Sequence, residues 1–167
     1  MSVTQVEAIE LRDGSTAQLH PMCAADAAGL SRFHSTLSPE TTYLRFFGVH
    51  PWLSDEELYR FTHVDHTARE AIVATAEDEI IAVARFDRLE DRSEAEVAFV
   101  VADSWQELGL GTVLFRRLAD RARELGVRRF VAEVLPHNRR MLAVFHHSGL
   151  PARSELRDGV VHLVLDL

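Results

Sequence analysis

The sequence predicts an α/β (α+β) fold in which a mixed, mostly antiparallel sheet carries helices on both faces. Apolar segments that alternate with polar residues meet at short Asp-containing turns, a pattern typical of β-hairpins. A long amphipathic helix at 109–126 separates two apolar strands, which must therefore run parallel through a right-handed crossover. The length of 167 residues fits a single domain covering 1–167.

The first third of the chain predicts a hairpin followed by three short helices. The hairpin turns at Asp13-Gly14. Apolar residues at helical spacing predict a helix over about 24–36, and Ser38-Pro39 starts a second helix with a cap residue and a first-turn proline. The pair Ser54 and Glu57 resembles a capping box, which predicts a third helix over 54–62.

The rest of the chain alternates strands and helices. Its predicted strands are 70–76, 79–86, 94–101 and 128–135, its predicted helices are 109–126 and 138–149, and a last Asp-Gly hairpin covers 154–167. The helix at 109–126 is the clearest, because its apolar residues form one stripe and Gly126 follows its last turn.

The basic residues exclude several classes of enzyme. All 18 are arginine, so the chain lacks the lysine that P-loop proteins, protein kinases and Schiff-base enzymes require. A formal charge of −8 argues against binding to nucleic acid. One cysteine, Cys23, excludes an internal disulfide, and no segment has the composition of a signal peptide or a membrane span. We therefore expect a cytoplasmic protein that binds neither nucleic acid nor membrane.

The segment 100–112 carries the strongest chemical signal. A strand runs into a loop with Gly109 and Gly111, and a long helix begins there. Glycines let backbone N–H groups approach an anion such as a pyrophosphate, and the helix N-terminus favours negative charge. A simple tight turn is the alternative. A dinucleotide fingerprint would need a third glycine where Leu114 stands, so we reject that interpretation.

The spacing Gln106-x-x-Gly109-x-Gly111 resembles the acyl-CoA signature of the GNAT N-acetyltransferases. The similarity follows the whole chain in order and is closest to the acetyltransferase domain of bacterial Pat-type protein-lysine acetyltransferases, on LSPETTYLRFF, VDH at 64–66, AVARF and AEVAFVV. The resemblance implies the GNAT acyl-CoA N-acyltransferase fold, with acetyl-CoA as co-substrate and no metal.

The resemblance also implies which residues hold acetyl-CoA. The pantetheine arm would lie along a strand that splays from its neighbour, and the pyrophosphate along the loop and helix start. The implied cofactor-binding residues are Phe99, Val100, Val101, Gln106, Glu107, Leu108, Gly109, Leu110, Gly111, Thr112, Asn138 and Phe145. A plain helix cap is an equally good interpretation of Asn138. Gly111→Asp is expected to place bulk and charge where the pyrophosphate sits.

Glu96 is the candidate catalytic base. An ammonium group must lose a proton before it attacks a thioester, and a carboxylate on an apolar strand has the raised pKa that this task needs. The Pat-type resemblance implies a catalytic glutamate at this position, whereas an outward-facing strand residue is the alternative. Glu94 is the second choice. Many relatives carry a tyrosine at position 145 that protonates the leaving thiolate, but Phe145 has no proton to give and instead packs against the cofactor arm or the core.

We therefore expect an acetyl-CoA-dependent N-acetyltransferase that acetylates a protein lysine, with an acyl-CoA synthetase as one possible acceptor. A small amine acceptor and a non-catalytic acyl-CoA-binding domain are the alternatives, and monomer and homodimer stay open. By family analogy Tyr43 and Arg45 line the acceptor site, and His66 is a further candidate there. His63 and His66 lack the additional ligands that a zinc site requires.

Overall fold

A computed structural model describes residues 5–167 of the chain. Its strands are β1 (Glu7–Glu10), β2 (Thr16–Pro21), β3 (Arg69–Ala76), β4 (Glu79–Arg88), β5 (Glu94–Val101), β6 (Arg129–Val134), β7 (Ala152–Arg157) and β8 (Val160–Asp166). Its α-helices are α1 (Ala27–Thr36), α2 (Pro39–Phe46), α3 (Asp55–Thr62), α4 (Leu110–Glu124) and α5 (Arg139–His146). Two short 3₁₀ turns, η1 (Ala24–Asp26) and η2 (Asp103–Trp105), precede α1 and the loop before α4.

The eight strands form one sheet in the order β1-β2-β3-β4-β5-β6-β8-β7. Every neighbouring pair is antiparallel except β5 and β6, which α4 connects as a parallel pair. The mixed, mostly antiparallel sheet expected from the sequence is therefore confirmed, together with the single parallel step.

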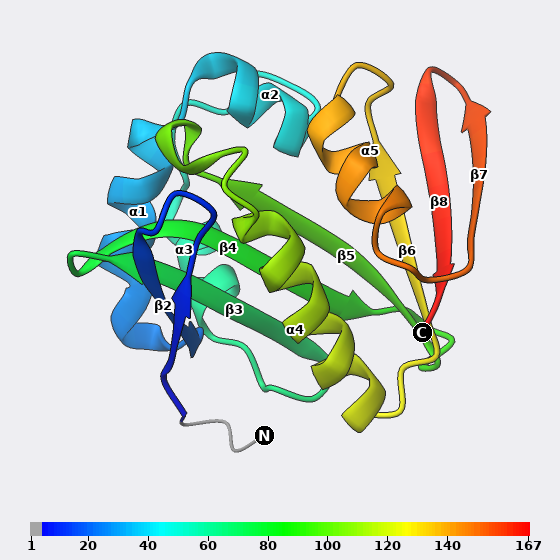
Figure 1. Cartoon of the computed structure of the whole chain (residues 1–167), viewed down its shortest axis with the longest axis horizontal. Coiled ribbons are helices and arrows are strands. Elements are labelled where there is room, and N and C mark those ends of the chain that lie inside the picture. Colours follow the sequence, from blue (N-terminus) through cyan, green and yellow to red (C-terminus); the bar gives the residue numbers. More distant parts are fainter. Residues whose placement is uncertain (1–4) are drawn as a thin grey trace.

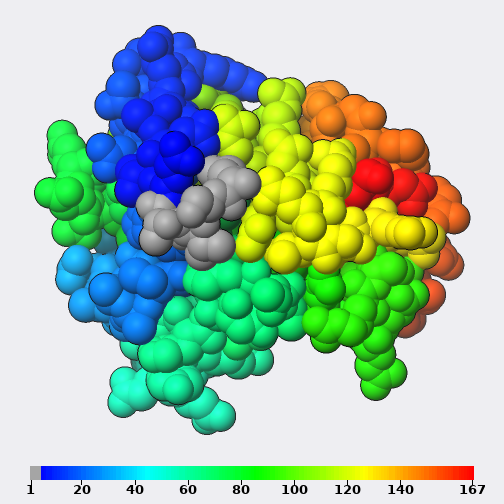
Figure 2. Space-filling view, turned by 90° about the horizontal axis from the view of Figure 1, so that it is seen from below, coloured from blue at the N-terminus to red at the C-terminus, as the bar shows by residue number. Residues whose placement is uncertain are grey.

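Helices cover both faces of the sheet, as predicted. In Figure 1, α4 and α5 lie in front of the sheet, whereas α1 and α3 lie behind it. Seen from below in Figure 2, the yellow and orange segments of α4 and its neighbours occupy the upper side and the turquoise segment around α3 the opposite side. Each face has its own apolar core, one formed mainly with α4 and α5 and the other with α1 and α3.

The starts of α2 and α3 follow from local sequence. Ser38 and Ser54 cap α2 and α3 by accepting hydrogen bonds from the N–H groups of Thr41 and Glu57, each at 3.1 Å. The Glu57 carboxylate in turn accepts hydrogen bonds from the Ser54 hydroxyl at 3.2 Å and, on its other oxygen, from the His50 ring at 2.7 Å.

No helix among residues 5–167 is long and apolar enough to cross a membrane. The same residues contain no group of three or more His, Cys, Asp or Glu side chains arranged to hold a metal ion.

Candidate acetyl-CoA and acceptor site

The strands β5 and β6 separate along their length. They pair only from Glu94 with Arg129 to Glu96 with Val131. Beyond Glu96, β5 keeps its antiparallel partner β4 but has no strand on its other edge. Figure 1 shows the two strands close at their starts and apart at their ends. The splay that the resemblance implied is present, and it leaves one backbone edge of 97–101 without a partner strand.

The loop between β5 and α4 carries a run of unpaired donors. Within residues 5–167, the backbone N–H groups of 107–112 donate to no protein acceptor, and the first bond of the helix joins the Val113 N–H to the Gly109 carbonyl at 3.1 Å. Gly109 adopts a φ of +86°, a left-handed conformation in which a residue with a side chain would be strained. Free N–H groups at the start of a 15-residue helix suit an anion.

The side chain of Gln106 braces this loop. Its amide nitrogen donates to the Val101 carbonyl at 3.0 Å, and its oxygen accepts a hydrogen bond from Arg140 of α5. Arg140 also forms an ion pair with Glu107 at 3.5 Å. These contacts fix the loop to the end of β5 and to α5, so the Gln106 side chain serves the shape of the loop.

Gly111 lies at a close contact with the apolar core. A Cβ atom at this position would lie 3.4 Å from the Phe99 ring and 3.6 Å from Val144. An aspartate there would first meet these apolar side chains. The structure thus changes the meaning of Gly111→Asp, because its first effect is on the packing of α4 against β5 and α5. Gly109 is the better position for testing the loop.

Arg12 is a residue of this region that sequence reasoning missed. Its N–H donates to the Leu108 carbonyl at 3.2 Å, and its Nε would lie 3.2 Å from a Cβ at Gly109. The Asp13-Gly14 hairpin therefore brings an exposed guanidinium against the loop. No sequence signal relates residue 12 to residue 109, because only the folded sheet brings the hairpin there.

Asn138 and Phe145 have structural partners. Asn138 caps α5, and its side-chain oxygen accepts a hydrogen bond from the Met141 N–H at 3.3 Å. Phe145 is 1% exposed, and its ring packs edge-on against Phe99 and Phe115 at centroid distances of 5.6 and 5.3 Å. The core position offered as one alternative for Phe145 is therefore observed, and contacts of either residue with a cofactor stay predictions.

Glu96 points to the opposite face of the sheet. Alternation along β5 puts Phe99 in the core under α4 and puts Glu96 and Ala98 on the face of α1–α3. The Glu96 side chain is open to solvent, yet its surroundings desolvate it. Burial, and then the charges of Glu133 and Asp87, raise the pKa of Glu96, while Arg45 opposes the rise. This is the environment that a carboxylate base needs.

Glu94, the second candidate, is engaged elsewhere. Its carboxylate accepts a hydrogen bond from the Arg129 guanidinium at 2.6 Å across the paired part of β5 and β6. The Arg129 guanidinium thus already occupies the Glu94 carboxylate. The geometry therefore favours Glu96.

The three residues expected to line the acceptor site lie in different surroundings. Arg45 lines a cavity under α1–α3, whereas Tyr43 is 45% exposed and does not line it. His66 is bound 2.7 Å from the buried carboxylate of Glu70, which also accepts a hydrogen bond from Arg121. That cluster connects α4 to the start of β3 and serves the fold.

Three comparisons relate the chain to known proteins. The family model described as "Acetyltransferase (GNAT) family" matches residues 30–150. The chain is 41% identical to the GNAT domain of S. lividans PAT, with a TM-score of 0.91 and 97% of each chain covered. It is 32% identical over 144 residues to "Acetyltransferase Pat" of Mycolicibacterium smegmatis, covering 84% of the chain but 43% of that protein.

A more distant structure shares the fold. The protein yncA from Salmonella typhimurium, solved with its cofactor acetyl-CoA, has a TM-score of 0.71 at 18% identity, over 90% of this chain and 92% of that one.

Proposed function

Because the chain belongs to the GNAT acetyltransferase family, we propose that it transfers an acetyl group from acetyl-CoA directly to the ε-amino group of a protein lysine, with Glu96 as the base. The observation that carries the proposal is that β5 offers two different surfaces, an unpartnered edge and a face that bears Glu96. One edge of the strand, followed by a loop of free N–H groups, is available to acetyl-CoA, and one face presents a carboxylate of raised pKa. Similarity to the Pat proteins supports lysine as the acceptor, although the chain spans less than half of the M. smegmatis relative.

The loop residues would hold the diphosphate of acetyl-CoA. The N–H groups of 107–112 would donate to its oxygens, and the guanidinium of Arg12 lies beside Gly109 to add positive charge. The unpaired backbone edge of β5 after Glu96, including Phe99, Val100 and Val101, would run beside the pantetheine arm. When bound, acetyl-CoA supplies an acetyl group activated as a thioester.

Glu96 would take up the proton that the acceptor ammonium loses. A carboxylate whose pKa is raised accepts a proton more readily than an ordinary glutamate, and solvent access lets it pass the proton on to water. Phe145 cannot protonate the leaving thiolate, so CoA would leave as the thiolate when the thioester bond breaks and would take its proton from water.

The chain offers an unusually clean assay. It contains no lysine, so acetyl-lysine formed during a reaction comes from the acceptor. Purified protein, acetyl-CoA and a panel of acyl-CoA synthetases, other proteins and small amines should yield acetyl-lysine on a protein acceptor. Glu96→Gln should still bind acetyl-CoA and lose most of this product. Turnover of small amines alone would favour the alternative acceptor class, and tight acetyl-CoA binding without any turnover would favour a regulatory domain.

A further inference from the structure

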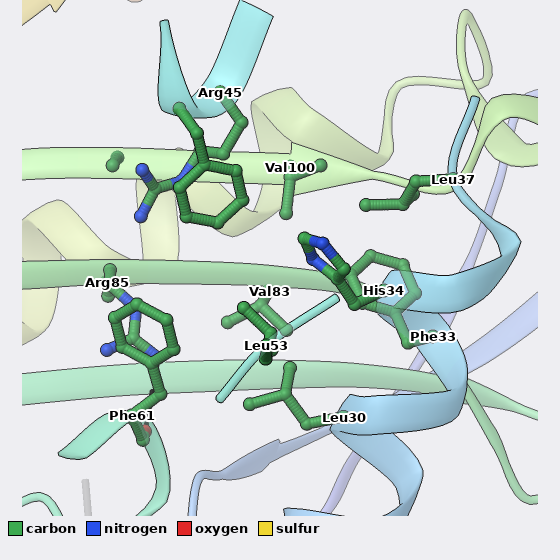
Figure 3. Close-up of a pocket in the computed structure, with 12 residues that line it drawn as sticks. Leu30, Phe33, His34, Leu37, Arg45, Leu53, Phe61, Val83, Arg85 and Val100 are labelled. Atoms are coloured by element: carbon green, nitrogen blue, oxygen red, sulfur yellow. Dashed lines mark hydrogen bonds between the residues drawn. The ribbon is translucent and has the colours of Figure 1, made fainter. Parts of the chain in front are cut away.

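Two arginines share one end of the cavity beneath α1–α3. Apart from His34, whose ring nitrogen donates to the His50 carbonyl, the other lining residues are apolar and include Leu30, Phe33, Leu37, Leu53, Val83 and Val100. Figure 3 shows Arg45 from α2 and Arg85 from β4 with their guanidinium groups toward the same side, away from Phe33 and Leu37. Two positive charges in an apolar cavity are costly unless an anion accompanies them.

Arg85 is buried and incompletely paired. It is 7% exposed; its Nη2 donates to the Phe61 carbonyl at 3.1 Å, and its Cζ lies 4.3 Å from the centre of the Phe61 ring. Its Nη1 is buried without a hydrogen-bond partner in the part of the chain that the structure describes. Burial, and next the charge of Arg45, lower the pKa of Arg85 to about 9.

Arg45 also lacks a counter-ion. Between residues 5 and 167 its guanidinium has no acceptor within hydrogen-bond or ion-pair distance, and its Cζ lies 4.8 Å from the centre of the Phe46 ring. Burial lowers the pKa of Arg45, against the charges of Glu96 and Asp87, which raise it. Asp87, the strand neighbour of both sites, instead pairs with Arg69 at 3.4 Å.

The cavity lies next to the proposed base. Arg85 is paired in register with Ala98 and Asp87 with Glu96, so both pairs project on one face of the sheet. Glu96 and Ala98 are therefore successive residues on that face, about 7 Å apart along the strand. A group bound by Arg45 and Arg85 would therefore lie close to the Glu96 carboxylate, which we propose takes up the proton of the acceptor amine.

We propose that Arg45 and Arg85 bind a carboxylate carried by the amine acceptor itself, in an inference that rests on the proposed acetyl transfer at Glu96. A planar carboxylate matches the donor fork of a guanidinium. The cavity offers about 30 Å³ of space, which suits a small planar group, and its walls carry leucine and valine side chains. The carboxylate belongs either to a free amino acid or to an acidic side chain beside the target lysine of a protein.

The first experiment measures carboxylate binding without turnover. Propionate and its neutral counterpart propionamide are titrated at matched ionic strength, with melting temperature and NMR chemical shifts as readouts. We expect propionate, but not propionamide, to stabilise the wild type, and Arg85→Met to weaken the propionate affinity at least about 10-fold. Arg60→Gln is the matched control, because Arg60 adds positive charge near both arginines without lining the cavity.

A second variant guards against misfolding. Should Arg85→Met fail to fold, Arg45→Gln at the partly exposed position must show the same loss. Equal effects of propionate and propionamide on the wild type, or an unchanged propionate affinity in the folded arginine variant, would overturn the proposal.

The second experiment identifies the source of the carboxylate. kcat/KM is compared for two acceptor pairs that differ only by carboxylate and amide: β-alanine with its amide, and two lysine peptides with Glu or Gln beside the lysine. We expect at least about a 10-fold preference for the carboxylate in one pair, lost in Arg85→Met and kept in Arg60→Gln. A preference in the first pair indicates a free amino acid, and one in the second indicates a protein. Equal kcat/KM within both pairs contradicts the proposal, whereas absence of all turnover with propionate still bound contradicts the proposed acetyl transfer instead.

Discussion

The two faces of β5 are built for different tasks. Under α4 and α5, the Phe99 side chain packs among the rings of Phe115 and Phe145. Under α1–α3, the same strand presents Glu96 beside two arginines that lack counter-ions in the described chain. The first face maximises apolar packing, and the second keeps charges close to apolar walls at a cost in stability. A single strand therefore separates the residues that hold the fold from those that we propose perform the chemistry.

The largest expected effect concerns turnover on the site face. Glu96→Gln should lower kcat about 10²- to 10⁴-fold at neutral pH, because the base is lost while the shape is kept. Acetyl-CoA affinity, measured by calorimetry, should stay within about twofold of the wild type. Glu94→Gln is the matched control on the same strand, and its effect should be small because Glu94 is already paired with Arg129. Full turnover in Glu96→Gln would end the assignment of the base.

Truncating a side chain in the apolar core under α4 and α5 should lower the free energy of unfolding. Phe145→Ala removes a fully buried ring from the aromatic cluster and should cost about 3–5 kcal/mol of unfolding free energy. Urea denaturation measures this loss, and Tyr43→Ala at a 45% exposed position should cost less than about 1 kcal/mol. Similar losses in the two variants would mean that the ring of Phe145 does not support the core.

Glycine substitutions at the two ends of α4 distinguish the effect of backbone strain from the effect on acetyl-CoA binding. Gly109→Ala places a side chain at φ of +86° and should cost about 1–2 kcal/mol of stability, with a loss of acetyl-CoA affinity of about 10-fold. Gly126→Ala is the control, because Gly126 has φ of +83° with open space around its Cβ and lies at the other end of α4. It should show the same loss of stability with unchanged affinity. Equal affinity losses in both variants would show that strain alone is responsible.

The smallest expected effect is a shift in the pH profile of kcat/KM when Glu133 is replaced. The charge of Glu133 raises the pKa of Glu96, so Glu133→Gln should lower that pKa. Activity needs the ionised carboxylate and is lost as the pH falls through its pKa. The acid limb of kcat/KM should therefore move to lower pH, and only slightly, since Glu133 is exposed and its field is screened. A shift to higher pH would contradict the charge arrangement around Glu96.

Local patterns in the sequence were sufficient for most of the fold. The Asp-Gly and Asp78 turns, the caps at Ser38 and Ser54, and the apolar stripe of α4 act within a few residues, and each element forms where its pattern indicated. The parallel step between β5 and β6 followed from the length of the connection.

The candidate site was only partly predictable. Gln106, Gly109 and Glu96 lie on one continuous strand and loop, so a linear motif finds them. Arg85 was not singled out from the sequence, because its unpaired nitrogen becomes visible only when β4 packs against α3. Arg12 reaches the loop through the sheet, and the burial of Phe145 depends on how α5 meets α4.

The pH profile of kcat/KM for the wild type and Glu96→Gln, with acetyl-lysine on the acceptor as the product, tests the central claim most directly. The account predicts a wild-type acid limb at a pKa above that of an ordinary glutamate, because burial and neighbouring carboxylates raise the pKa of Glu96. Glu96→Gln should give low activity with no such limb. An acid limb retained unchanged in Glu96→Gln would contradict the account, since another group would then be the base.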